Sequence, residues 1–137
     1  MKKKFAIVGK IVYFILMTIK KTFSDLEFNA HANHPNGVQA KLDLGNNTEI
    51  SVVSMLTRES EFGGLYGDVS KGTYEVAVFQ GDNMIPLSAW DDVIGWRTED
   101  EITELMSKLQ NGQDDTQAFI DELYLAKSKN RAELGLD

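Results

Sequence analysis

The chain has 137 residues, of which 21 are acidic and 14 are basic, and its formal net charge is −7. This length suits one domain that buries its own core, and the absence of cysteine excludes disulfides and thiolate metal sites. A protein that binds duplex nucleic acid ordinarily presents a basic face, so the acidic balance argues against that class. It still allows a pocket in which a few arginines hold a small anion.

The N-terminal segment is the least typical part of the sequence. Residues 1–21 read MKKKFAIVGKIVYFILMTIKK, in which lysines flank an apolar run of about 15 residues, shorter than the roughly 20 needed to cross a bilayer. No small-residue cleavage site follows this run. Three interpretations stay open: a membrane signal, an element packed on the domain, and an extension upstream of a true start at Met17.

We favour the extension among these three interpretations. The chain then divides into residues 1–16, an N-terminal extension of doubtful status, and residues 17–137, a single α+β domain. Residues 1–16 hold four lysines and no acidic residue, so the charge without them is −7 − 4 = −11. Both charges describe an acidic domain, and we expect it not to associate with membranes.

Alternating apolar residues predict the first strands. Residues 23–28 suggest a first strand or an extended segment, and residues 29–37, NAHANHPNG, are typical of turns. Residues 38–44 alternate between apolar and polar side chains, which is the pattern of a half-buried strand. Residues 45–47, Gly-Asn-Asn, tolerate positive φ angles and predict a hairpin turn, after which residues 48–55 form the returning strand.

A glycine-rich loop separates this hairpin from the following strands. Residues 57–72 contain four glycines without any periodicity, and a loop of this length in a small domain is often functional. Residues 73–80 predict a further strand, residues 81–83 a turn, and residues 84–87 a short edge strand because of Pro86. The strands are joined mainly by hairpin-type turns, so the sheet should be mostly antiparallel.

Two helices are predicted at the end of the sequence. Thr98 and Glu101 form a capping box that marks the start of the first helix, and Gly112 marks its end. Asp114 or Asp115 can cap the second helix, which decays into the polar tail KSKNRAELGLD. The apolar positions at helical spacing are Ile102, Leu105, Met106 and Leu109 in the first helix, and Phe119, Ile120, Leu123 and Tyr124 in the second.

Strands followed by helices predict an α+β fold, with a mostly antiparallel sheet of four or five strands followed by two C-terminal helices. We expect the first helix to cover one face of the sheet. The second helix should either cover the sheet or reach a partner chain. Exposed sheet edges are often paired in dimers, so we expect a homo-oligomer, a dimer or larger.

The sequence contains no arrangement that we interpret as catalytic. His31 and His34 lie in a turn-rich segment, and no third ligand for a metal lies near them in the sequence. The loop of residues 57–72 matches neither a Walker motif nor a dinucleotide fingerprint, and no nucleophile with an adjacent base can be named. We therefore expect no enzyme activity, no catalytic residue, no metal and no cofactor.

The segment with the most binding chemistry is residues 90–97, WDDVIGWR, which holds both tryptophans, two aspartates and one of three arginines. Indole and guanidinium faces stack on purines, and arginine pairs with phosphate. Carboxylates accept hydrogen bonds from base amines and ribose hydroxyls. For Trp90 and Trp96, ligand contact, core packing and an interface stay open as interpretations.

This segment also carries a family resemblance. The run from Trp90 to Gln110, WDDVIGWRTEDEITELMSKLQ, resembles the terminal motif of small phage proteins, in which a short Asp-Asp-Val-x-Gly turn precedes Thr-Glu-Asp-Glu and a helix. The stretches HPNGVQAKLDLGNNTEISVVS and GTYEVAVF are similar to the same proteins. The resemblance begins near Thr22 and ends near Gln110, so residues 1–16 and the second helix lie outside it. The best-described proteins that the chain resembles are the first type of anti-Thoeris sponges.

The resemblance implies a binding function without catalysis. The sponges inhibit bacterial immunity by sequestering cyclic ADP-ribose signals, some also hold cyclic oligonucleotides, and they are oligomers with ligand pockets between subunits. We therefore expect a phage counter-defence protein, in the cytoplasm of the infected bacterial host, that sequesters a small cyclic nucleotide. The candidate ligand-binding residues, chosen by their chemistry, are Arg58 and Arg97 for phosphate, Trp90, Trp96 and Tyr66 for stacking on adenine, and Asp92 for hydrogen bonds from ribose or base.

The acidic charge supports an alternative from a different class, an acidic phage inhibitor that binds a host protein, in one form as a mimic of nucleic acid. A mimic should spread carboxylates over one face and bind a basic partner with an affinity that collapses at high salt. A sponge should instead bind a small molecule and need no protein partner. These two expectations separate the two classes by experiment.

Overall fold

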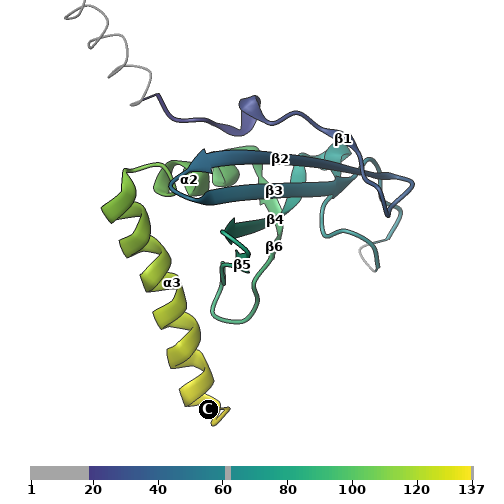
Figure 1. Cartoon of the computed structure of the whole chain (residues 1–137). Helices are drawn as coiled ribbons and strands as arrows, with labels where there is room; N and C mark the ends of the chain where they lie inside the picture. Colours follow the sequence, from purple (N-terminus) through teal and green to yellow (C-terminus); the bar gives the residue numbers. More distant parts are fainter. Residues whose placement is uncertain (1–18, 61–62, 137) are drawn as a thin grey trace, which may run out of the picture.

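The structure is a computed structural model that describes residues 19–60 and 63–136 of the chain. The extension proposed for residues 1–16 lies outside the described residues. Figure 1 shows one sheet with a helix against it and a second, long helix that projects past the sheet. The α+β fold expected from the sequence, with an antiparallel sheet followed by two C-terminal helices, is confirmed.

The sheet contains six strands in the described residues. They are β1 (Asn29–Ala30), β2 (Gly37–Gly45), β3 (Thr48–Met55), β4 (Thr73–Gln80), β5 (Asn83–Met84) and β6 (Ile94–Thr98). Their order across the sheet is β1-β2-β3-β4, and both β5 and β6 lie beside β4. All these pairs are antiparallel. β5 and β6 share the outer edge of one strand, so each covers only part of it.

The last strand was not expected from the sequence. The last strand predicted from the sequence is residues 84–87, and no strand is predicted between it and the helix that begins after Thr98. In the structure, residues 94–98 form β6 and pair with residues 73–76 of β4. The strand is short and contains Gly95 and a register shift, so its period-two pattern is too weak to detect.

One face of the sheet carries the hydrophobic core. Alternate residues of the three long strands point to this face, as the period of two predicts. α2 (Glu99–Lys108) lies across it and buries Ile102 and Met106, so the first helix covers one face as expected. The buried apolar strand residues are Ala40, Leu44, Ile50, Val52, Tyr74, Val76 and Val78.

Two local signals in the sequence produce the expected geometry. Gly45, Asn46 and Asn47 adopt φ angles of 80°, 52° and 61° and form the turn between β2 and β3. At the start of α2, the Glu101 N–H donates to Thr98 Oγ1 at 3.2 Å, and the Thr98 N–H donates to Glu101 Oε1 at 3.1 Å. The predicted capping box is therefore confirmed.

The second helix, α3 (Gln113–Glu133), differs from the expectation at both ends. Its N-cap is Gly112, and Asp114 and Asp115 lie in the first turn, so the prediction that one of these aspartates caps the helix is wrong. Carboxylates in the first turn stabilise the positive end of the helix dipole without capping it. The helix also continues through most of the predicted polar tail, whose lysine, arginine, alanine and glutamate residues are good helix formers.

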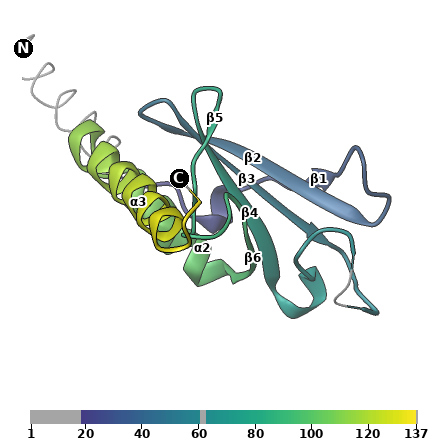
Figure 2. The ribbon, with the colours of Figure 1, turned by 90° about the horizontal axis from the view of Figure 1, so that it is seen from below.

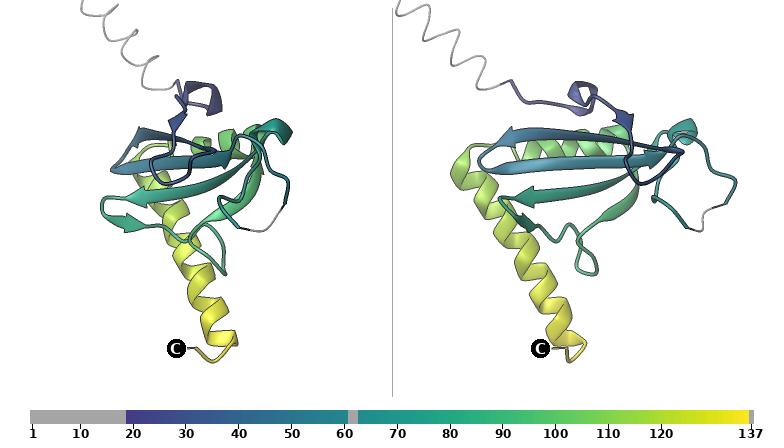
Figure 3. Two further views of the ribbon diagram at one scale, coloured as in Figure 1. Left: turned by 90° about the vertical axis from the view of Figure 1, so that its right-hand side faces the viewer. Right: turned by 45° about the vertical axis from the view of Figure 1, so that its right-hand side comes forward.

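Contacts with the rest of the domain support the second half of α3. Lys127 Nζ lies 3.0 Å from Asp92 Oδ1, and Asn130 Nδ2 donates to the Ala89 carbonyl at 2.8 Å. Both partners belong to the loop between β5 and β6, which Figure 3 shows beside the helix. Within residues 19–60 and 63–136, no helix combines the length and the apolarity needed to cross a bilayer.

The N-terminal part of the described chain attaches to α2. In place of a strand over residues 23–28, residues Phe23–Asp25 form a single 3-10 turn, η1. The Phe23 N–H donates to Thr103 Oγ1 of α2 at 3.1 Å, and the Phe23 ring lies 4.9 Å from the Tyr74 ring. Tyr74 is buried there, and burial raises the pKa of its hydroxyl, with Glu99 adding to the rise.

Candidate ligand-binding site

Three of the six candidate residues meet at one end of the sheet. The Arg58 guanidinium carbon lies 5.0 Å from the centre of the Trp96 ring, a cation–π contact, and the Tyr66 ring lies 6.4 Å from the Trp96 ring. Arg58 follows β3, Tyr66 belongs to the glycine-rich loop, and Trp96 belongs to β6. The fold therefore gathers these side chains from three separate segments of the chain.

A bulge in β6 directs Trp96 toward Arg58. The pairing of β4 with β6 shifts register between Tyr74 and Val76, and Trp96 adopts a φ of 58°. Positive φ is rare for a bulky residue and costs on the order of 1–2 kcal/mol. The Trp96 N–H donates to the Tyr66 carbonyl at 2.9 Å, which helps to hold this geometry. Backbone strain of this kind is concentrated at functional sites.

Glycines allow the loop to approach the sheet closely at this point. A Cβ atom on Gly95 would lie 2.6 Å from the Tyr66 Cβ, and a Cβ on Gly67 would lie 2.7 Å from Ser54 Oγ and 2.8 Å from the Thr73 carbonyl oxygen. No side chain fits in either space. The loop backbone is therefore packed directly on β4 and β6, and this packing gives the cluster a rigid base.

Arg58 organises the loop around it. Its Nε donates to the Ser60 carbonyl at 3.0 Å, its Nη2 donates to the Gly63 carbonyl at 2.7 Å, and its Nη1 donates to the Leu65 carbonyl. The edge of the guanidinium is thus occupied by the backbone, while one face lies over Trp96. Arg58 supplies positive charge and fixes the loop, and a bidentate grip on a phosphate would require it to release these carbonyls.

A small cleft lies between the Arg58–Trp96 stack and the short helical turn η2 (Val69–Lys71). Its volume is about 150 Å³, and Lys71 and Thr73 also line it. Asp68 at its floor is buried and accepts hydrogen bonds from Ser70 N at 3.0 Å and Ser70 Oγ at 2.6 Å. Pockets for whole small molecules measure about 300–1,000 Å³, so this cleft suits one group, such as a phosphate or part of a base.

The other three candidate residues lie elsewhere. Arg97 follows Trp96 in β6, but its Nη1 donates to Glu101 Oε2 of α2 at 3.2 Å. Asp92 pairs with Lys127 of α3, and Trp90 is 74% exposed in the loop between β5 and β6. Figure 2 shows the loop that follows β3 at the end of the sheet opposite α3. The six residues therefore do not form one site within a single chain.

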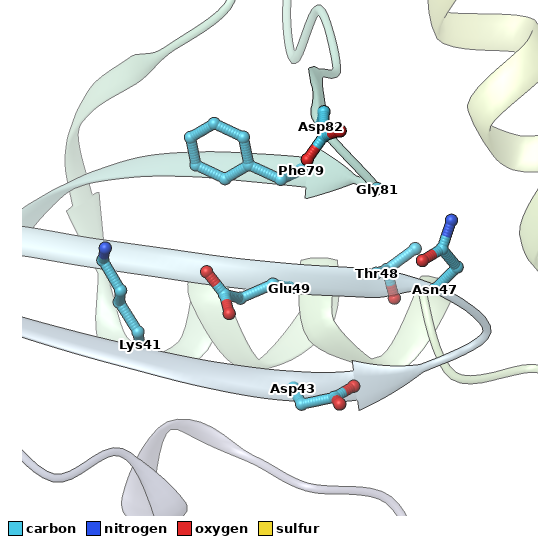
Figure 4. Close-up of a pocket in the computed structure, with 8 residues that line it drawn as sticks. All are labelled: Lys41, Asp43, Asn47, Thr48, Glu49, Phe79, Gly81 and Asp82. Carbon is cyan, nitrogen blue, oxygen red and sulfur yellow. The ribbon is translucent and has the colours of Figure 1, made fainter.

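The second face of the sheet carries a larger groove, of about 440 Å³ (Figure 4). The side chains of Lys41, Asp43, Glu49 and Phe79 occupy strand positions that alternate with the core residues, so they lie on the face of the sheet opposite α2 (Figure 4). Three of them are carboxylates, from Asp43, Glu49 and Asp82, and Lys41 supplies one positive charge. Asp43 and Glu49 lie directly opposite each other on β2 and β3, and like charges in this position repel. This groove suits a basic partner and not a phosphate.

The two histidines form part of a turn. Their rings lie 4.9 Å apart, and His31 Nδ1 accepts a hydrogen bond from the Asn33 N–H at 3.0 Å. Within the part of the chain that the structure describes, no three histidine or carboxylate side chains are grouped as a metal site would require. The pair therefore has a structural role in the turn that leads into β2.

Sequence reasoning missed Lys71, an exposed cation that lines the cleft beside the Arg58–Trp96 stack. Nothing in its local sequence marks it, because only the packing of the glycine-rich loop on the sheet brings it there. Comparison with known proteins adds no further guide to function. No protein-family model, no curated protein and no solved structure matches the chain at a significant level.

Proposed function

We propose that this protein is a non-catalytic phage counter-defence sponge, which binds a cyclic nucleotide signal at the cleft beside Trp96 and sequesters it. The observation that carries the proposal is the stack of Arg58 on Trp96, with Tyr66 beside it, at a strained position of β6. The side chains of Tyr66 and Trp96 remain 48% and 41% exposed, so their rings are available to a ligand.

The chemistry of the cleft fits one part of a nucleotide. Trp96 and Tyr66 offer aromatic faces for a purine, and stacking of this kind contributes about 1–3 kcal/mol per base. Lys71 and Arg58 place two positive charges at the cleft, where Glu59 and the buried Asp68 supply two negative charges. The groove on the second face of the sheet has one aromatic ring, from Phe79, and one positive charge, from Lys41, against three carboxylates. Of the two surfaces, the cleft is the better match for an anionic ligand that carries a base.

The size of the cleft favours a site shared between chains. A volume of about 150 Å³ holds part of a cyclic nucleotide, so the rest of the ligand needs a second surface. The proposed sponge is therefore a homo-oligomer in which a neighbouring chain completes the pocket, and it works in the cytoplasm of the infected bacterial host. Tight sequestration by a preformed pocket agrees with the rigid, glycine-packed base of the loop.

A role in binding is also favoured over catalysis by the groups at the cleft. The Asp68 carboxylate is already held by Ser70, and the Arg58 donors are occupied by loop carbonyls. Groups that are fixed in this way suit a preformed binding surface. A sponge should return its ligand unchanged when it is denatured.

The experiment compares the two tryptophans by calorimetry against cyclic ADP-ribose isomers and cyclic di- and trinucleotides. We expect the protein to bind one of these ligands and Trp96→Ala to weaken binding roughly tenfold or more, because a stacking surface is lost. Trp96→Phe should restore part of the affinity. Trp90→Ala is the matched control and should bind as the unchanged protein does. Binding of no ligand in this panel, or equal losses from both tryptophans, would contradict the proposal.

A specific observation also supports the alternative, an acidic inhibitor that binds a host protein. Asp43, Glu49 and Asp82 are gathered on the uncovered face of the sheet. If this face binds a basic host protein, Asp43→Lys with Glu49→Lys should abolish capture of that protein, and raised salt should do the same to the unchanged chain. The same double variant should leave the binding of nucleotides unaltered, so the two functions are separable.

A further inference from the structure

The long helix α3 has one side that faces the domain and one side that does not. On the inner side, Thr116 and Ile120 are buried, and Lys127 and Asn130 hold the loop between β5 and β6. Figures 1 and 3 show the helix running past the sheet with its opposite side turned away from the other elements. The outer side of α3 is therefore not covered by any other described element of the domain.

An apolar stripe runs along the outer side. Leu125 is 54% exposed at its centre, near the middle of the helix. Ala118 and Ala132 lie about two helical turns before and after it, so all three residues share one face. Small residues on both sides of a leucine allow a second helix to approach closely. This face is therefore shaped to accept a second helix.

The charges beside the stripe are divided between its two ends. Asp121 and Glu122 precede Leu125, and Lys129 follows it. Among the described residues, neither Glu122 nor Lys129 takes part in an ion pair. This order of charges makes the outer face of α3 complementary to the same face of a second copy whose helix runs in the opposite direction.

We propose that the outer face of α3 binds the same face of a second copy of this chain, with the two helices antiparallel and a two-fold axis close to Leu125. Leu125 then meets Leu125 of the second copy, and Glu122 of each chain lies against Lys129 of the other. Ala118 of each chain lies opposite Ala132 of the other. Such self-complementary contacts are the usual basis of two-fold dimers.

The expected dimer is weak and depends on concentration. A helix of 21 residues is about 31 Å long, and one pair of such helices gives a contact near the small end of specific interfaces. α3 and the loop that carries Arg58 lie at opposite ends of the sheet, so this contact is separate from the cleft beside Trp96 (Figure 2). It requires no ligand, so its test is independent of the proposed function.

Cysteine cross-linking tests the direction of the two helices. The chain has no cysteine, so single variants report one position each. Leu125→Cys should form a disulfide-linked dimer under mild oxidation. Ala118→Cys alone and Ala132→Cys alone should not, whereas an equal mixture of these two variants should cross-link to each other. Cross-linking of Ala118→Cys to itself would show parallel helices, and a failure of Leu125→Cys would exclude the contact.

A charge exchange tests the pairing by sedimentation equilibrium. Glu122→Lys alone or Lys129→Glu alone places like charges opposite each other and should weaken the dimer roughly tenfold or more. The double variant exchanges the two charges and should return the dissociation constant to within about threefold of the original. Thermal unfolding of all three variants should match that of the original chain, because both positions are exposed. A double variant as weak as the single variants would overturn the proposal.

Discussion

Trp90 and Trp96 belong to one short segment of the sequence and lie in contrasting surroundings. Trp96 lies in a bulge at positive φ, with Arg58 stacked on its ring and its N–H bound to the Tyr66 carbonyl. Trp90 is 74% exposed in a turn where Ser88 Oγ accepts hydrogen bonds from the N–H groups of Trp90 and Asp91. Two tryptophans that are close in the sequence therefore need not belong to one binding site, because the surroundings of each are set by residues from other parts of the chain.

The loops that support the two tryptophans differ in the same way. The loop beside Trp96 is fixed by three donors of one arginine and by glycines packed on the sheet. The loop that carries Trp90 is attached to α3 by two contacts near the surface, Asp92 with Lys127 and Ala89 with Asn130. We expect the first loop to open rarely and the second to open often, which hydrogen exchange can measure.

The largest expected effect comes from crowding the base of the first loop. Gly67→Ala places a methyl group 2.8 Å from the Thr73 carbonyl oxygen and the Tyr74 Cα, which are backbone atoms that cannot rotate away. We expect the free energy of unfolding to fall by about 1–3 kcal/mol, measured by chemical denaturation. Adding Ser54→Ala removes only the third close atom, Ser54 Oγ. A full recovery in that double variant would show that side-chain crowding, and not backbone crowding, limits this position.

Arg58→Lys tests how strongly Arg58 fixes the loop beside Trp96, for comparison with the loop that carries Trp90. Lysine keeps the charge but lacks the planar fork, so it cannot reach three carbonyl groups together. Since each hydrogen bond contributes roughly 0.5–1.5 kcal/mol, we expect a loss of about 1–3 kcal/mol and faster exchange of the amides around Leu65. The matching change at the loop that carries Trp90 is Lys127→Ala, which removes the half-exposed ion pair with Asp92. It should lower the free energy of unfolding by less than about 1 kcal/mol. Equal losses would mean that the two loops are fixed to the same degree.

A smaller effect tests the strain at Trp96. Trp96→Ala and Trp96→Gly both remove the ring, but only glycine adopts a φ of 58° without cost. We expect the glycine variant to be more stable than the alanine variant by about 1 kcal/mol, the reverse of the usual order. The same pair of changes at Trp90 should show no such reversal. If alanine were better at both positions, the backbone at Trp96 would not be strained in solution.

The sequence predicted the parts of the fold that depend on neighbouring residues. The turn at Gly45 to Asn47 and the cap formed by Thr98 and Glu101 follow from local chemistry, and the structure confirms both. β6 depends on pairing with the distant strand β4, which no local pattern records. The helix-forming residues of the tail favour a longer α3, and contacts with the loop that contains Ala89 and Asp92 support that length.

The same reasoning applies to the candidate site. Residue chemistry identified Arg58, Tyr66 and Trp96, which the fold brings together. It could not show that Asp92 pairs with Lys127, since the placement of α3 depends on the whole core, whereas Arg97 pairs with Glu101 only four residues further along the chain. In the structure Arg97 and Asp92 each pair with a nearby opposite charge, so they do not join the candidate residues beside Trp96.

The smallest expected effect concerns the end of β6, where Glu101 closes the cap of α2. Hydrogen bonds hold the pKa of Glu101 below its usual 4.5, first from the Thr98 N–H, then from the Thr98 hydroxyl, and then from Arg97. A lowered pKa means that the carboxylate stabilises the fold above its unfolded pKa, and that this contribution is lost as the pH falls through the folded value. The stability difference between the original chain and Glu101→Gln should therefore shrink below about pH 4.5 in thermal unfolding.

Glu104→Gln, an exposed change in the same helix away from the cap, measures the background. A difference that stays constant from pH 7 to pH 3 would show that the neutral amide caps the helix as well as the carboxylate does, and that the strand bearing Trp96 is fixed without help from this charge.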